Sequence, residues 1–184
     1  NTGIGGVELT NTEISQNSNA GLHVLNLGSG VFTVKNNVIY QNGTYSIYMN
    51  LGGLISGREL GQLSDNELYG TNGPEYATIG GSITGDITIP EGKYIGSGIG
   101  VPNNKTLNIE PGTQIFFRPS GGITVNGPLT ASGTSERKIE LTSLDVIGSG
   151  TSGQTGGNSF WSGIYVGTTG HCEMDYSRIS YADY

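Results

Sequence analysis

The phrase NTEISQN, residues 11–17, decides the fold because the chain rewrites it 25 positions later as NNVIYQN, residues 36–42. Both copies read Asn-x-x-Ile-x-Gln-Asn, and an aliphatic residue, Leu9 or Val34, stands two positions before each copy. A phrase repeated at a fixed distance indicates stacked repeats, in which equivalent residues of successive copies lie side by side. Beyond the phrase itself, Leu22 matches Ile47 and Val24 matches Met49.

A third, weaker copy follows the first two and keeps the same order of apolar and turn-forming residues. Because apolar and polar residues alternate over only three to five positions, each copy predicts short strands rather than helices. The third copy places Leu63 at the position of Leu9, Asp65 at that of Asn11, Leu68 at that of Ile14 and Thr71 at that of the second Asn.

The second half of the chain carries apolar-x-apolar triplets at residues 107–109, 123–125 and 139–141, which are 16 positions apart. Another triplet, residues 164–166, follows a Gly/Ser/Thr-rich insertion that runs from about residue 148 to 159. This spacing also suggests a solenoid, with one or two strands in each repeat.

Stacking explains why asparagine recurs. A tight turn between strands needs a residue that tolerates a left-handed backbone, and Asn does so at little cost. Asn side chains at equivalent turns can also hydrogen-bond along the stack, while Ile14 and Ile39 pile into an apolar column. A left-handed β-helix would need a sustained apolar-Gly hexapeptide rhythm, which is absent. We therefore expect an all-β fold, a right-handed parallel β-helix of roughly seven to nine coils of about 20–25 residues.

Three phrases carry a family resemblance: LNIEPGTQIFF (residues 107–117), GGITVNGPLTASGTSERKIELTS (121–143) and WSGIYV (161–166). They resemble secreted right-handed parallel β-helix proteins of the pectate-lyase-like superfamily. The resemblance implies the fold and a secreted or cell-surface location. It leaves the activity open, because that superfamily includes lyases, hydrolases, epimerases, adhesins and inert stalks.

The order of the coil types along the chain predicts a junction between two partial β-helix units. Residues 1–73 resemble later coils, residues 74–100 resemble a cap-like connection, and residues 101–184 resemble early coils. We therefore consider two stacked partial units, cut out of phase from a longer repeat protein. Since each coil leaves strand edges for the next one, head-to-tail self-association is a further expectation.

The charge, the apolar runs and the cysteine content of the chain limit the classes of partner to be expected. With 8 Lys+Arg against 15 Asp+Glu, the net charge of −7 leaves no basic stripe for phosphates, so nucleic acid is not an expected partner. No apolar run approaches the length of a membrane span. The single cysteine, Cys172, excludes an internal disulfide and reads as a small buried side chain.

Residues for catalysis are sparse. There is no Asp-Asp pair of the kind that hydrolases of this superfamily use, and glycoside hydrolysis needs two carboxyl groups at a defined separation. Asp65 and Glu67 form an acidic cluster. On one strand they would share a face, which suggests a weak Ca²⁺ site, although a solvated outer face explains them better. His171 beside Cys172 lacks a second ligand pair with zinc spacing. We expect no other cofactor.

The tyrosines are the best candidates for contact with a glycan. Tyr40 and Tyr69 take equivalent places after Ile39 and Leu68 and predict an outward stripe, with Tyr45 and Tyr48 in neighbouring coils. The alternative is that these rings stabilise the outer face by packing on each other. Trp161 is expected to pack at a corner of a coil.

These observations favour a non-catalytic extracellular or cell-surface module, structural or adhesive, that contacts a polysaccharide or cell-surface glycan. Two alternatives stay open. One is a fragment of a polysaccharide lyase, hydrolase or epimerase, and the other is a carbohydrate-binding module.

Overall fold

The computed structural model describes residues 6–27, 31–63, 65–70, 73–144 and 160–182, and within them the chain is all-β apart from two short 3-10 helices. The expected all-β class is therefore confirmed. Thr71 and the insertion at residues 148–159 lie outside the described residues.

The helices are η1 (Leu51–Gly53) and η2 (Arg58–Gln62). The strands of the first half are β1 (Val7–Thr10), β2 (Glu13–Ser15), β3 (Ala20–Val24), β4 (Phe32–Lys35), β5 (Val38–Tyr40), β6 (Tyr45–Asn50), β7 (Glu67–Gly70), β8 (Gly73–Pro74) and β9 (Thr78–Ser82). Those of the second half are β10 (Ile87–Ile89), β11 (Lys93–Val101), β12 (Leu107–Ile109), β13 (Gln114–Phe117), β14 (Ile123–Val125), β15 (Pro128–Ser132), β16 (Ile139–Ser143), β17 (Ile164–Val166), β18 (His171–Asp175) and β19 (Ser177–Ile179).

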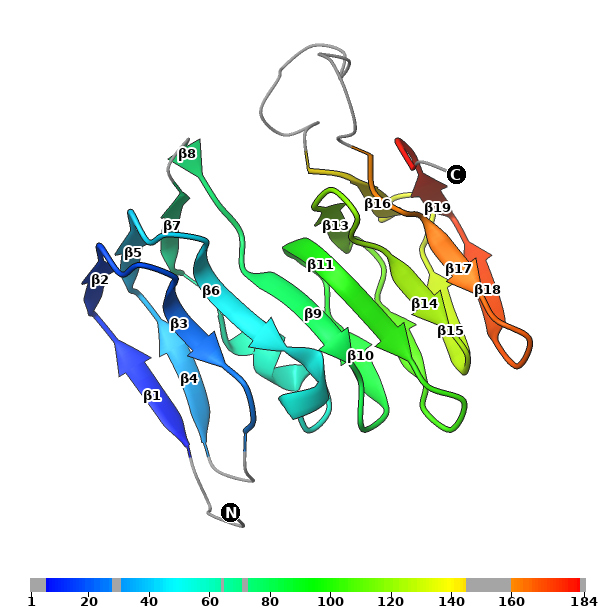
Figure 1. Cartoon of the computed structure of the whole chain (residues 1–184), viewed down its shortest axis with the longest axis horizontal. Helices are drawn as coiled ribbons and strands as arrows, with labels where there is room; N and C mark the ends of the chain where they lie inside the picture. The colour runs from blue at the N-terminus through cyan, green and yellow to red at the C-terminus, as the bar shows by residue number, and fades with distance from the viewer. Residues whose placement is uncertain (1–5, 28–30, 64, 71–72, 145–159, 183–184) are drawn as a thin grey trace.

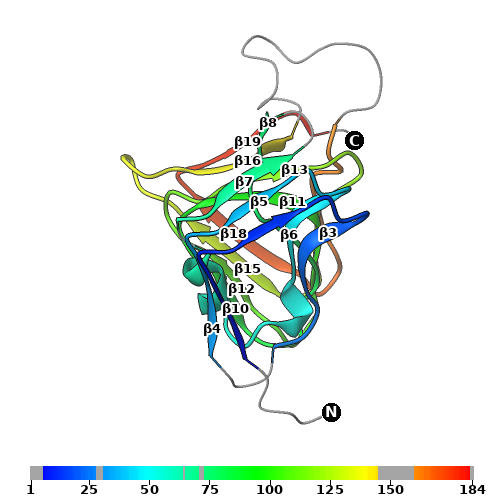
Figure 2. The same cartoon turned by 90° about the vertical axis from the view of Figure 1, so that its left-hand side faces the viewer.

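The strands form long parallel sheets around a common apolar interior (Figures 1 and 2). Strands that follow each other in sequence mostly lie in different sheets, and each pairs with a strand of the next repeat. In the described part of the chain, only the β7–β8 pair is antiparallel. The sheets are β1-β4, β2-β5-β7-β8, β10-β12-β15-β18 and a nine-stranded sheet β19-β16-β13-β11-β9-β6-β3, in which β14 pairs with β11 and β17.

The pairing register confirms the repeat predicted for the first half. Strand β1 pairs with β4, β2 with β5 and β3 with β6, each in parallel. Strand β7 adds the third copy by pairing with β5. Equivalent residues therefore lie side by side as expected. The matched pairs are Leu9–Val34, Ile14–Ile39, Ile39–Leu68, Leu22–Ile47 and Val24–Met49.

The turns use asparagine in two ways. Asn11, Asn36 and Asp65 all have a positive φ, of 53°, 56° and 60°, so the first position of the phrase supplies the left-handed turn as predicted. The ladder lies at the following position, where Asn37 Oδ1 accepts from the Thr12 backbone N–H at 2.9 Å and Asn37 Nδ2 donates to Asn66 Oδ1 at 2.9 Å. A second ladder joins the other end of the phrase, where Asn17 Nδ2 donates to Asn42 Oδ1 at 2.9 Å.

The 16-residue spacing in the second half does not set the stacking, and that interpretation is wrong. Strands β12 and β14 lie in different sheets, and β14 does not pair with β16. Leu107 pairs with Leu129 and Ile115 with Leu141, so partners lie 22 and 26 positions apart. From β12 the chain passes through β13 and β14 before β15 returns to the sheet of β12, and the triplet strands β12, β14 and β16 do not pair with one another.

Residues 74–100 join the two halves. Strand β9 pairs in parallel with β6 on one side and β11 on the other, so the nine-stranded sheet runs through this region without a break. On another side, the sheet of β2, β5 and β7 ends with the antiparallel strand β8. The division into later coils, connection and early coils stays a prediction.

The interior is aliphatic along its length, with side chains such as Ile39, Ile79 and Leu141 fully buried. At one corner Trp161 is also fully buried, stacks on Phe117 with ring centroids 4.5 Å apart, and donates from Nε1 to the Ser180 carbonyl at 2.8 Å. Trp161 therefore packs in the interior, and its place at a corner of a coil stays a prediction. The hydrogen bond satisfies the one polar group that burial of an indole would otherwise leave unpaired.

Replacement of Asn37 by alanine should test the ladder. Asn37 is 1% exposed, and its amide bonds to Thr12, Leu9 and Asn66. The Asn37→Ala variant leaves buried partners unsatisfied, so we expect the free energy of unfolding to fall by about 2–3 kcal/mol. Urea denaturation measures this change. Asn19→Ala, at an exposed position outside the ladder, is the matched control, and an equal effect of the two substitutions would contradict the role of the ladder.

Candidate functional site: an uncharged groove on the outer face

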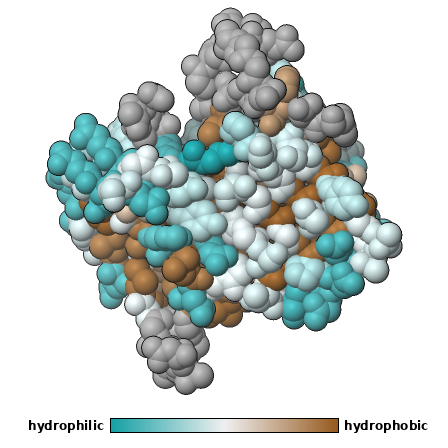
Figure 3. Space-filling view, viewed as in Figure 1, coloured by the Kyte–Doolittle hydropathy of each residue, from teal (hydrophilic) through white to brown (hydrophobic). Residues whose placement is uncertain are grey.

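An outward row of small residues crosses four neighbouring strands. Gly100 of β11 pairs with Ser82 of β9 and Thr124 of β14, and Thr124 pairs with Tyr165 of β17. Because side chains alternate along a strand and the flanking Ile99, Val101 and Ile123 are buried, this row faces solvent. The surface over β9, β11 and β14 has near-neutral hydropathy over much of its area (Figure 3).

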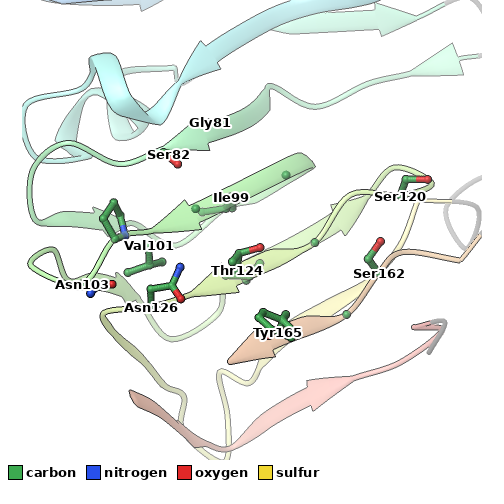
Figure 4. Close-up of a pocket in the computed structure, with 16 residues that line it drawn as sticks. Gly81, Ser82, Ile99, Val101, Asn103, Ser120, Thr124, Asn126, Ser162 and Tyr165 are labelled. Carbon is green, nitrogen blue, oxygen red and sulfur yellow. The ribbon is translucent and has the colours of Figure 1, made fainter. Parts of the chain in front are cut away.

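This face is hollowed into a groove of about 710 Å³. Glycines make much of its floor, and hydroxyl and amide side chains surround it (Figure 4). Asn103 and Asn126 lie at one end, Ser120 and Ser162 at the other, and Thr124 between them. Tyr165, with 67% of its surface exposed, lies along one side.

Two glycines keep the groove open. Gly98 has a φ of 144°, a conformation that L side chains rarely adopt, and a Cβ there would project into open space. A Cβ at Gly100 would lie 2.3 Å from the Ser82 hydroxyl oxygen, so a larger residue would displace the groove wall. A ligand can therefore approach the backbone closely.

The polar side chains around the groove are free to bind. Across the described ranges, none of them makes a hydrogen bond to the rest of the protein. Hydroxyl and primary amide groups both donate and accept, which suits a ligand rich in hydroxyl groups. These side chains belong to Ser82, Asn103, Ser120, Thr124, Asn126 and Ser162.

The groove presents hydroxyl and amide groups and carries no charged side chain. Its lining contains no Asp, Glu, Lys, Arg or His. Glycoside hydrolysis uses a pair of carboxyl groups, and general acid–base catalysis needs a titratable side chain within hydrogen-bond reach. The groove offers hydrogen bonds, a glycine floor and one exposed aromatic ring.

The predicted tyrosines fall on two separate surfaces. Tyr40 and Tyr69 pair directly across β5 and β7, so they lie side by side as expected. Their hydroxyls bond to neighbouring carboxylates, Tyr40 to Glu13 at 2.5 Å and Tyr69 to Glu67 at 3.4 Å. With 42% of its surface exposed, Tyr69 can reach solvent molecules. Glycan contact at this pair stays a prediction.

Tyr45 and Tyr48 lie in β6, which belongs to the nine-stranded sheet and not to the sheet of Tyr40 and Tyr69. Their ring centroids are 5.1 Å apart, and Tyr48 meets His23 edge-on at 4.9 Å. The Arg118 guanidinium lies 5.0 Å from the Tyr45 ring centroid. These rings pack on one another, which matches the structural alternative considered for them.

A second hollow, of about 480 Å³, lies where the two halves meet. Unlike the groove, it carries charge, and its lining includes Tyr69, Tyr76 and Tyr94 with Glu67, Glu75, Glu91 and Lys93. Glu75 and Glu91 come from segments for which the sequence carried no functional signal. Their proximity depends on how β7 and β8 end beside the start of β11.

Two of the three carboxylates in this hollow are already engaged. Glu75 accepts from the Ser46 hydroxyl at 2.7 Å and lies 3.5 Å from Arg118. Glu91 pairs with Arg137 at 3.1 Å. These ion pairs leave Glu67, which accepts from the Tyr69 hydroxyl, as the carboxylate of the hollow without a salt bridge in the described residues.

The residues considered for metal binding or nucleophilic chemistry are Asp65 with Glu67, and Cys172. Asp65 lies in a turn ahead of β7, which begins at Glu67, so the two do not alternate along one strand. Among the described residues there is no cluster of three Asp, Glu, His or Cys side chains that could hold a metal ion. The weak Ca²⁺ site at this pair stays a prediction. At Cys172, partial burial raises the pKa of the thiol, which opposes formation of a nucleophilic thiolate.

No protein-family model, curated protein or solved structure matches this chain. In the described ranges, no helix has the length and apolar character needed to cross a bilayer.

Tyr94, which lines the charged hollow, makes the stability of the fold depend on pH in the alkaline range. Burial, with a smaller contribution from Glu110, raises the pKa of Tyr94 above its ordinary value of 10.0, so the folded protein keeps the phenol neutral where the unfolded chain ionises. Stability from this group is complete below pH 10 and is lost as pH rises from there toward the raised folded pKa. Its contribution should fall by about 1.4 kcal/mol per pH unit.

Denaturation in urea between pH 9 and pH 11.5 would measure this loss. The Tyr94→Phe variant removes the titrating group and should flatten the alkaline decline relative to the unaltered protein. Tyr176→Phe, at an exposed tyrosine, is the control and should leave the decline unchanged. Equal slopes for Tyr94→Phe and the unaltered protein would contradict the assignment.

Proposed function

We propose that this chain is a right-handed parallel β-helix of the pectate-lyase-like type. It serves as a non-catalytic extracellular or cell-surface module that binds neutral carbohydrate in its outer groove. The observation that carries the binding proposal is the uncharged, glycine-floored groove, whose hydroxyl and amide groups have no protein partners across the described ranges and whose wall includes Tyr165.

The β-helix assignment is supported by parallel pairing between segments one repeat apart. It is also supported by the left-handed turn residues at equivalent positions and by the Asn ladders. Each coil would contribute three strands, one to each side, and leave an apolar column inside. The resemblance in residues 107–117, 121–143 and 161–166 suggests the superfamily and, with it, the extracellular location.

Neutral carbohydrate fits the groove better than acidic carbohydrate. A uronate or sulfated chain would be expected to meet Lys or Arg in its site, and the groove lining has none. A neutral sugar presents hydroxyl groups to hydrogen-bonding side chains and an apolar ring face to an aromatic side chain. Tyr165 supplies the ring, and Thr124 and Asn126 supply neighbouring polar groups.

Affinity electrophoresis in gels that contain neutral or acidic polysaccharides tests this function. We expect retention by a neutral polysaccharide and a loss of affinity of about tenfold in Tyr165→Ala, the effect of losing one stacking contact. Thr124→Arg should also weaken binding, because it places a long charged side chain in the middle of the groove. Both positions are exposed, so the fold should survive.

Tyr69→Ala is the matched control, since it removes an exposed tyrosine from the other surface. Binding lost only in Tyr69→Ala would place the glycan on the Tyr40–Tyr69 pair and contradict the groove. Absence of retention on any neutral polysaccharide would contradict carbohydrate binding altogether.

A catalytic function has one observation in its favour, the charged hollow beside Tyr69. Glu67 there lacks a salt bridge in the described residues, and Lys93 lies in the same lining. The chain would then be a fragment of a polysaccharide lyase, hydrolase or epimerase. An assay for new chain ends on acidic polysaccharides, with and without Ca²⁺, decides the matter. Release that disappears in Glu67→Gln would favour the enzyme, and we expect no release.

A further inference from the structure

The two ends of the stack expose positions that are buried elsewhere. At the C-terminal end Cys172 and Met174 are half-covered and Ile179 is 46% exposed, whereas their partners one repeat back, Leu129, Ala131 and Leu141, are fully buried. At the N-terminal end Val7, Leu9 and Ile14 are also half-covered. The two ends of the stack lie at opposite ends of the molecule's longest axis (Figure 1).

These end segments share one pattern. Residues 171–181, HCEMDYSRISY, align with residues 6–16, GVELTNTEISQ, so that their turns coincide and their strand bounds differ by one residue at most. Tyr176 and Tyr181 have a positive φ, of 43° and 56°, and the equivalent Asn11 and Gln16 have φ values of 53° and 59°. The two turns are five residues apart in both segments.

Two coils with this pair of turns already stack on each other within the chain. Asn36 and Gln41, five residues apart with φ values of 56° and 52°, belong to the repeat that pairs in parallel with the repeat of Asn11 and Gln16. A coil with this turn pattern therefore stacks on another coil with the same pattern. By that register, Ile179 would meet Ile14 and extend the apolar column of Ile115 and Leu141.

At one position of this edge, Arg178, the charges are complementary, whereas the same alignment sets Glu8 opposite Glu173. Glu140 pairs in register with Arg178, and the Arg178 side chain is 65% exposed with one nitrogen 3.8 Å from the Glu140 carboxylate. The next position along this row, by the shared pattern, is Glu13 of the N-terminal segment, which is exposed. Arg178 would then lie between two carboxylates. A hollow of about 760 Å³, lined in part by Met174, Tyr176 and Arg178, adjoins the edge.

We propose that a second copy of this chain docks head-to-tail on this edge. Strands β1 and β2 of one copy pair in parallel with β18 and β19 of another, which covers the half-exposed inner residues of both ends and sets Glu13 beside Arg178. The interface uses two different surfaces, so it leaves a free edge at each end of the pair and propagates into linear assemblies. This inference stands independently of the carbohydrate groove.

Sedimentation velocity over a range of protein concentrations tests the proposal on two variants, each of which reverses one charge at the junction. Arg178→Glu sets two carboxylates against each other at the junction, and Glu13→Arg sets two cations against each other. Each variant alone should associate at least about tenfold more weakly than the unaltered chain. An equimolar mixture should regain association, because every junction between unlike copies joins opposite charges.

Arg58→Glu is the matched control, because Arg58 is exposed on η2, midway along the chain, and it should leave association unchanged. Urea denaturation confirms that each variant folds; if Arg178→Glu does not, Glu13→Arg and Glu13→Gln test the same junction from the opposite end. A chain that stays monomeric at all concentrations would overturn the proposal. So would charge variants that associate like the unaltered chain, or a mixture that fails to recover.

Discussion

Parallel backbone pairing between residues one repeat apart is the constraint on which the rest of the structure depends. It brings like residues into contact, so each inner position must be apolar and each turn position must tolerate the same backbone. Asn11, Asn36 and Asp65 meet the second demand with positive φ, and the Ile14–Ile39–Leu68 column meets the first. Buried amides such as Asn37 then hold successive turns in register through hydrogen bonds along the stack.

The groove follows from the same constraint. Once pairing aligns Ser82, Gly100, Thr124 and Tyr165 in one row, the outer face takes its shape from their sizes. Small residues in three adjacent strands make the hollow, and the tyrosine in the fourth makes its wall. The same row holds no charge, which separates this surface from the charged hollow at the junction of the two halves. The uncharged groove and the charged hollow thus lie at different places on one scaffold.

Local sequence predicted the first half of the fold well, because a seven-residue phrase and its flanking aliphatic residues recur with little drift. It predicted the 16-residue period of the second half wrongly, because apolar triplets look alike whichever side of the molecule they occupy. The groove escaped prediction for a related reason. Its glycines and hydroxyl side chains are spread from residue 81 to residue 165, and only the pairing of β9, β11, β14 and β17 brings them together. Tyr165 stood in a recognised phrase, yet its exposure depends on its place in β17.

The most direct measurement of the central claim is a methyl and backbone NOESY spectrum of isotopically labelled protein. Parallel stacking predicts cross-peaks between Leu9 and Val34, between Ile14, Ile39 and Leu68, and between Leu107 and Leu129. It also predicts that strands adjacent in sequence, such as β1 and β2, show no ladder of cross-strand backbone contacts. Antiparallel contacts between β1 and β2, or between β4 and β5, without the long-range pairs would contradict the stacked arrangement and, with it, the groove.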